Sequence, residues 1–134
     1  MPENDNKHVR LKQRIANLER AVGLLDDALD IGSPTLTERA GIIQFYEMAF
    51  ELTWKCLKDY LEVKGFNPKY PRDTLKMAVQ YEIIDQGETW LKALTDRNLT
   101  SHIYDEKTSV LVEQAIRNEY HPLLQQVHSF MKKL

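Results

Sequence analysis

The segment GIIQFYEMAFELTWKCLKDYLEV, residues 41–63, decides the fold class. Its apolar side chains recur every three or four residues, which is the spacing of one face of an α-helix. They form two rows, the first with Ile43, Tyr46, Phe50, Trp54, Leu57 and Leu61, and the second with Phe45, Met48, Leu52 and Cys56. Because a helix that is apolar on two sides is buried on two sides, this segment predicts a central helix over about residues 36–64.

The segments on either side repeat the same spacing. They predict further helices over about residues 6–31, 72–82, 86–98 and 105–132, with the few glycines and prolines standing mostly between them. Pro122 is the exception, and because a proline inside a helix removes an amide donor, it predicts a bend near residues 118–121. The sequence therefore predicts an all-α fold, an antiparallel up-and-down bundle of four to five helices.

Local signals support the ends of the central helix. Thr35 and Glu38 have the spacing of a capping box, in which each side chain binds the other residue's backbone amide. Gly65 fits the left-handed residue that follows a helix. On the polar face of the helix, Glu51 and Lys55 are four residues apart in the order that favours an ion pair.

Composition limits the class of protein. The 134 residues favour one domain, residues 1–134, with about residues 1–6 flexible, and the net charge of −2 gives no overall field for nucleic acid or an anionic membrane. The polar start and the lack of a long apolar stretch predict a cytoplasmic protein without a membrane segment. Cys56 is the only cysteine, which excludes an internal disulfide and a multi-cysteine zinc site. The two-sided helix has more apolar surface than a small bundle needs, so we expect a homodimer.

The residues most suited to chemistry lie between Asp96 and Asp105. Arg97 offers a planar fork of donors for phosphate, His102 titrates near neutral pH, and Tyr104 carries a phenol. On one straight helix Arg97 and His102 would diverge by about 140°, so we expect a break between Asn98 and Asp105 or convergence supplied by a second subunit. By spacing alone, helix capping or a plain surface position is the favoured explanation of these residues.

Other candidates are weaker. Trp54 is first of all a core residue, but it is also suited to the floor of a substrate pocket with Glu51 and Lys55 at the rim. His121 and His128 lack the carboxylates of a metal site, so we expect no metal ion. The chain has no glycine-rich phosphate loop, and we expect no cofactor.

Three segments resemble one known family: QFYEMAFELTWKCLKDYLEVKG at 44–65, PRDTLKMAVQ at 71–80 and TWLKALTDRNLTSHIYDE at 89–106. They are similar to the nucleotidyltransferase substrate-binding proteins, small helical proteins of the wider HEPN group that are encoded beside minimal nucleotidyltransferases. The signature of that group is Arg, four to six residues, then His. Arg97, Asn98 and His102 match it, and Tyr104 completes the Arg-x4-His-x-Tyr form.

The resemblance implies a dimer that brings two motifs to one cleft, a nucleotidyltransferase partner, and two roles. In the first role, the chain is a noncatalytic subunit that binds a substrate, an RNA or a nucleotide, for the partner. In the second role, Arg97 and His102 form a metal-independent ribonuclease, supported by Asn98, which the partner silences by nucleotidylating Tyr104. The chain lacks the metal-binding carboxylate motif of a nucleotidyltransferase, so we do not expect it to transfer nucleotides by itself. A helical scaffold whose polar motif only caps a helix is the remaining alternative.

Overall fold

The computed structural model describes residues 2–98 and 105–134, all in helices and their connectors, with no β-strand in these ranges. The helices are α1 (Pro2–Leu29), α2 (Leu36–Val63), α3 (Pro71–Gln80), α4 (Gly87–Asn98), α5 (Glu106–Ala115) and α6 (His121–Lys132), with a π-helical turn, η2 (Ile116–Tyr120), between the last two. The all-α prediction is confirmed. Helix bounds agree to within two residues except at α1, which starts earlier than residue 6.

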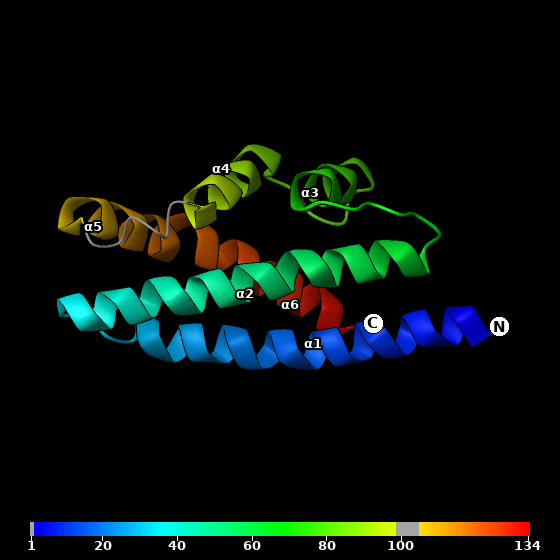
Figure 1. The fold of residues 1–134 in the computed structure, drawn as a ribbon, viewed down its shortest axis with the longest axis horizontal. Coiled ribbons are helices and arrows are strands. Elements are labelled where there is room, and N and C mark those ends of the chain that lie inside the picture. The colour runs from blue at the N-terminus through cyan, green and yellow to red at the C-terminus, as the bar shows by residue number, and fades with distance from the viewer. Residues whose placement is uncertain (1, 99–104) are drawn as a thin grey trace.

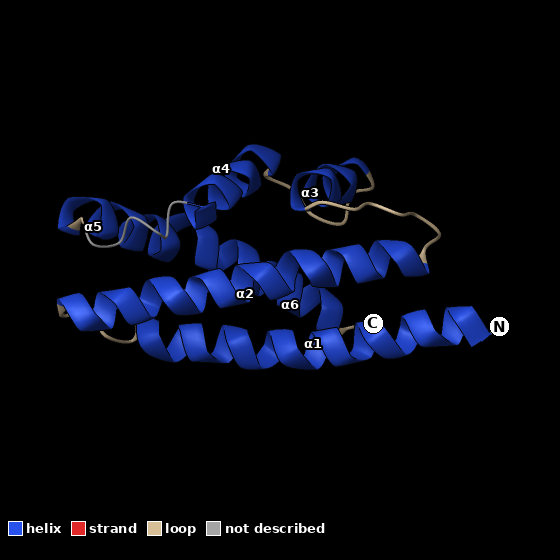
Figure 2. Cartoon of the chain, viewed as in Figure 1, coloured by secondary structure: helices blue, strands red, loops and turns tan. Residues whose placement is uncertain are grey.

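The helices alternate in direction around α2. Helices α1 and α2 form a long antiparallel pair, and α4 also runs in the direction opposite to α2 (Figures 1 and 2). The α5–α6 arm runs in the same direction as α2. Helix α6 packs against both α1 and α2, while α3, α4 and α5 each pack against α2. Helix α2 is therefore the centre of the bundle, as its two apolar rows predict.

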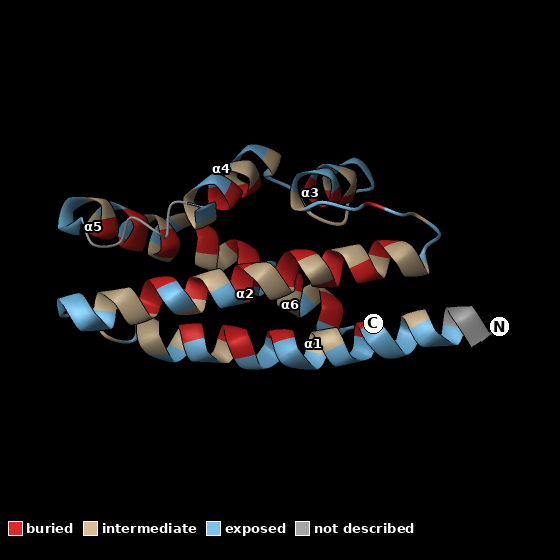
Figure 3. Cartoon of the chain, viewed as in Figure 1, coloured by how far each residue is buried: buried red, intermediate tan, exposed pale blue. Residues whose placement is uncertain are grey.

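Burial varies along α2 (Figure 3), and the exposure of the individual side chains differs between the two rows. The first row is entirely buried, and Trp54, at 8% exposure, is its most accessible member. In the second row Cys56 is fully buried, Phe45 and Leu52 are half-buried, and Met48 is 43% exposed. The second row thus leaves apolar surface uncovered within one chain.

The predicted ends of α2 are confirmed. Thr35 Oγ1 accepts a hydrogen bond from the Glu38 amide at 3.1 Å, and Glu38 Oε1 accepts one from the Thr35 amide at 2.9 Å. Gly65 has a φ of +96°, the left-handed conformation that glycine adopts without steric cost.

The predicted bend near Pro122 is also confirmed. The turn η2 widens the helix over Ile116–Tyr120 and ends two positions before Pro122. Because proline cannot donate to the carbonyl four residues back and its ring clashes with it, a wider turn relieves both problems. The α5–α6 arm therefore bends instead of continuing straight (Figure 1).

A buried ion network joins the α1–α2 corner to this arm. The Glu113 carboxylate accepts hydrogen bonds from Arg39 Nε at 2.9 Å and Arg117 Nε at 2.8 Å. Arg117 also donates to the carbonyls of Leu29 and Ile31, at 2.8 and 2.6 Å. These bonds cap the free end of α1 and fix its position relative to α5 and η2.

Among the described residues, every helix is too short or too polar to cross a lipid bilayer.

Candidate functional site

The candidate site lies at the carboxyl end of α4. Trp90, Ala93 and Leu94 bury one face of this helix and fix it on the bundle. Arg97 and Asn98 follow in its last turn, where the helix dipole favours a cationic side chain. This placement leaves Asn98 exposed and Arg97 half-buried.

Contacts from α2 hold Arg97 in place. Arg97 Nη2 lies 3.2 Å from Glu51 Oε2, and its guanidinium carbon lies 6.0 Å from the centre of the Phe50 ring. Glu51 in turn pairs with Lys55 at 3.4 Å, as its spacing predicts. The structure therefore brings Arg97 to the Glu51–Lys55 pair, which sequence reasoning had selected independently of it.

Trp54 lies in the core, which is the first of the two roles that its sequence position suggests. It is nearly fully buried, and its indole nitrogen has no hydrogen-bond partner among the described residues.

Two buried tyrosines donate hydrogen bonds to α4. The Tyr46 hydroxyl donates to the Ala93 carbonyl at 2.6 Å, and the Tyr120 hydroxyl donates to the Asp96 carboxylate. The two rings stack with centroids 5.5 Å apart. Sequence reasoning placed Tyr46 in an apolar row of the central helix but missed these hydrogen bonds.

Both phenols stay protonated at neutral pH. Burial raises the pKa of Tyr46 well above its ordinary value, and the nearby Tyr120 and Asp96 raise it further. Burial also raises the pKa of Tyr120, and its hydrogen bond to Asp96 adds to the increase. The two tyrosines therefore act as hydrogen-bond donors that position α4.

An open cavity of about 420 Å³ lies beside this support, between α4 and the α5–η2 arm. Its walls combine apolar residues of α5 with polar groups, in chain order Lys92, Asp96, Thr108, Leu111, Val112, Gln114, Ala115, Asn118 and Glu119. Lys92 Nζ lies 2.9 Å from Glu119 Oε2 across it, and this hydrogen bond raises the pKa of Lys92. The cavity volume is within the range of small-molecule sites, roughly 300–1,000 Å³.

His102 and Tyr104, the remaining members of the predicted cleft, lie outside the described residues. Their convergence with Arg97 stays a prediction. Helices α4 and α5 are separate and differ in direction (Figure 1), which is the arrangement that a break between Asn98 and Asp105 predicts.

The two histidines of α6 each face an acid of α1. His121 contacts Asp26, and His128 Nε2 lies 3.9 Å from Glu19 Oε1. No cluster of three or more metal-binding side chains occurs in the described part of the chain.

A family model described as "Nucleotidyltransferase substrate binding protein like" matches residues 13–133. The chain belongs to this family. A curated relative, the probable ribonuclease HepT of Haemophilus influenzae, is 32% identical over 78 residues, which are 54% of this chain. The match spans only about half of that relative, 53% of its length.

Several solved structures have a fold similar to that of this chain. A crystal structure of a Thermus thermophilus protein has 27% identity and a TM-score of 0.80, over 86% of this chain and 98% of that one. A HEPN toxin of Shewanella oneidensis, described as tri-AMPylated and in complex with an MNT antitoxin, has 18% identity and a TM-score of 0.74, over 92% and 97%. A Haemophilus influenzae protein, described as having the fold of a nucleotidyltransferase substrate-binding domain, has 24% identity and a TM-score of 0.68, over 91% and 96%. The family expected from the sequence is confirmed.

Proposed function

We propose that this chain is the accessory, substrate-binding subunit of a two-component nucleotidyltransferase system, the HEPN half of a toxin–antitoxin-like pair. The observation that carries the proposal is the family match over residues 13–133. On this proposal the chain is a cytoplasmic single-domain protein that acts as a homodimer. The uncovered second row of α2, with Met48 exposed, is suited to the contact between subunits.

The substrate site in this proposal is the end of α4. The Glu51 carboxylate and the Phe50 ring both contact the guanidinium of Arg97 and fix its position. The arginine is therefore preorganised to bind a phosphate oxygen. The neighbouring cavity between α4 and α5 gives space for the rest of a nucleotide-sized ligand. His102 and Tyr104 are assigned to the same site by the motif.

The test is nucleotidyl transfer by the partner enzyme, measured with and without this chain. We expect addition of the chain to lower the KM of the partner for its acceptor, because the chain supplies part of the binding site. Arg97→Ala should remove this effect, whereas Asp27→Asn, a change of an exposed carboxylate on α1, should keep it. A KM that is the same with and without the chain contradicts the proposal.

A second candidate is a metal-independent ribonuclease, and the match to the probable ribonuclease HepT favours it. In this reaction His102 either removes the proton of the ribose 2′-hydroxyl or protonates the leaving 5′-oxygen. The 2′-oxygen bonds to the adjacent phosphorus while the bond from phosphorus to the 5′-oxygen breaks, which leaves a 2′,3′-cyclic phosphate and a free 5′-hydroxyl. Arg97 stabilises the charge that develops on the phosphate, and Asn98 supports it. A nucleotide attached to Tyr104 would place bulk and negative charge beside Arg97 and block RNA.

Purified protein and a labelled RNA separate the two candidates. The ribonuclease hypothesis predicts that the protein cleaves the RNA without added metal, and that both Arg97→Ala and His102→Ala abolish this cleavage. It also predicts that the partner with ATP adds nucleotide mass to the wild type but not to Tyr104→Phe. If the RNA stays intact at micromolar protein concentration, the ribonuclease hypothesis is wrong and the noncatalytic role remains.

A further inference from the structure

We propose that the cavity between the α3–α4 connector and α6 binds an organic cation, an ammonium or guanidinium group on an aliphatic stem. This cavity has a volume of about 420 Å³ and lies apart from the α4–α5 site. The residues that line it come from the end of α3, the connector and α6: Val79, Glu82, Ile83, Ile84, Asp85, Gln86, Gln126 and Val127.

The chemistry of the lining selects the sign of the ligand. It contains two carboxylates, Glu82 and Asp85, and no basic side chain among its described residues. Gln86 and Gln126 add two carboxamides, whose oxygens accept hydrogen bonds from N–H groups. An anion would be repelled here, whereas an ammonium or guanidinium would find both countercharge and acceptors.

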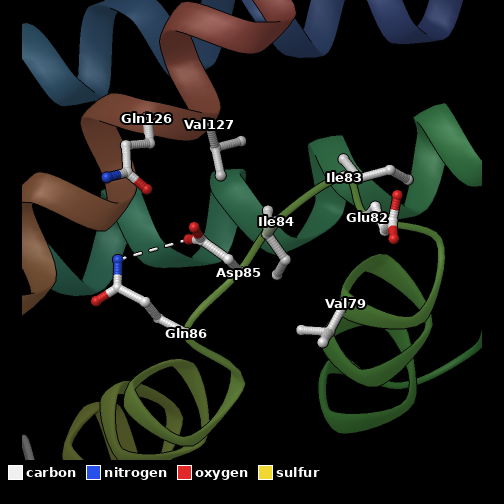
Figure 4. Close-up of a pocket in the computed structure, with 8 residues that line it drawn as sticks. All are labelled: Val79, Glu82, Ile83, Ile84, Asp85, Gln86, Gln126 and Val127. Carbon is white, nitrogen blue, oxygen red and sulfur yellow. Dashed lines mark hydrogen bonds between the residues drawn. The ribbon is translucent and has the colours of Figure 1, made fainter.

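The positions of these groups fit a cation with a stem. In Figure 4 the Asp85 carboxylate lies between the Gln86 and Gln126 side chains, while Glu82 lies at the opposite end of the cavity. Aliphatic side chains of Val79, Ile84 and Val127 lie between the two ends. The cationic head therefore fits beside Asp85, and an aliphatic stem fits along the apolar wall.

The connector is fixed before a ligand binds. Glu82 and Gln86 have φ values of +60° and +58°, which residues other than glycine rarely adopt. The amides of Ile83 and Ile84 donate to the Ala78 carbonyl at 2.9 and 3.3 Å, and both side chains pack against the core. A preformed site loses less conformational entropy on binding.

The charge of Asp85 is available to the ligand. Within the described ranges its carboxylate accepts one long hydrogen bond, of 3.5 Å, from Gln86 Nε2, and both side chains are at the surface. Lysine or arginine side chains of a partner protein and small free amines share the required chemistry, and the experiment distinguishes these two sources.

The first measurement titrates the ¹⁵N-labelled chain with n-butylammonium, n-butylguanidinium and neutral n-butanol, followed by ¹H–¹⁵N NMR. We expect saturable shifts for the two cations at residues 82–86 and 126–127, and none for butanol. Asp85→Asn, which keeps the shape of the side chain, should weaken binding about tenfold, the equivalent of ~1.4 kcal/mol. Asp27→Asn removes an equal charge from an exposed position on α1 and should leave the affinity unchanged.

The second measurement adds the nucleotidyltransferase partner. If Asp85→Asn weakens the complex and butylammonium competes with it, the cation is a side chain of the partner; if the complex is unaffected, the ligand is a free amine. The proposal is overturned if neither cation shifts these resonances and the complex is insensitive to Asp85→Asn. It is also overturned if Asp85→Asn binds the cations as tightly as the wild type. Neither outcome bears on Arg97, so the proposed function is tested separately.

Discussion

Replacement of Glu113 by alanine measures what the buried ion network contributes to stability. Glu113 is 7% exposed, and its carboxylate accepts two charge-assisted hydrogen bonds, from Arg39 and Arg117. Each such bond contributes about 1.5–3 kcal/mol. Arg39 and Arg117 keep 14% and 25% of their side chains exposed, so water recovers part of the loss. We therefore expect Glu113→Ala to lower the free energy of unfolding by about 3 kcal/mol.

Urea unfolding followed by circular dichroism gives this free energy directly. A loss of this size should also lower the thermal midpoint by roughly 10 °C for a domain of this length. Glu47→Ala, which changes a half-buried glutamate of α2 outside this network, is the control and should cost less than about 0.5 kcal/mol. If Glu113→Ala is as stable as this control, the network does not hold the α1–α2 corner to the α5–α6 arm.

The structure makes three further predictions. Burial alone would raise the pKa of Glu113, but hydrogen bonds from Arg117 and Arg39 outweigh burial and lower that pKa. The ionised Glu113 therefore stabilises the folded protein fully above its unfolded pKa of about 4.3, and this stabilisation is lost as the pH falls through the lower folded value. Glu113→Gln should flatten this part of the pH profile of the free energy of unfolding, measured with urea. Burial raises the pKa of Cys56 to about 12, so the thiol should resist iodoacetamide at about pH 8 in the native protein and react after unfolding, as measured by intact mass. Tyr120→Phe removes the hydrogen bond to Asp96 and should cost about 1–2 kcal/mol in the same unfolding assay, and an unchanged stability would show that this bond contributes nothing.

The features that the sequence predicted depend on residues close together in the chain. The helical period of α2, the capping box at Thr35 and the bend at Pro122 each follow from backbone geometry over a few residues. For the same reason Gly65 marks the end of α2 correctly. These local signals were enough to give the fold class and the order of the helices.

The features that it missed join residues far apart in the chain. Glu113 lies 74 positions from Arg39, and Tyr120 lies 24 from Asp96, so no spacing rule connects them. The connector before α4 also escaped prediction, because Glu82 and Gln86 are not residues that normally mark positive φ. Tertiary packing fixes these details.

The candidate site was found in parts. Arg97 was selected by the chemistry of its neighbourhood and by the motif, and Glu51 and Lys55 by their position on the polar face of α2. The contact between Arg97 and Glu51 depends on how α4 packs on α2, which periodicity does not specify. The assignment of His102 and Tyr104 to this site stays a prediction that depends on the motif.

Calorimetric titration of this chain with its proposed nucleotidyltransferase partner is the sharpest test of the proposed role. We expect a saturable heat of binding that Asp27→Asn, at an exposed position on α1, leaves unchanged. An absence of binding heat at two temperatures, with both proteins folded and the nucleotidyltransferase bound to its nucleotide, would contradict the role of an accessory subunit.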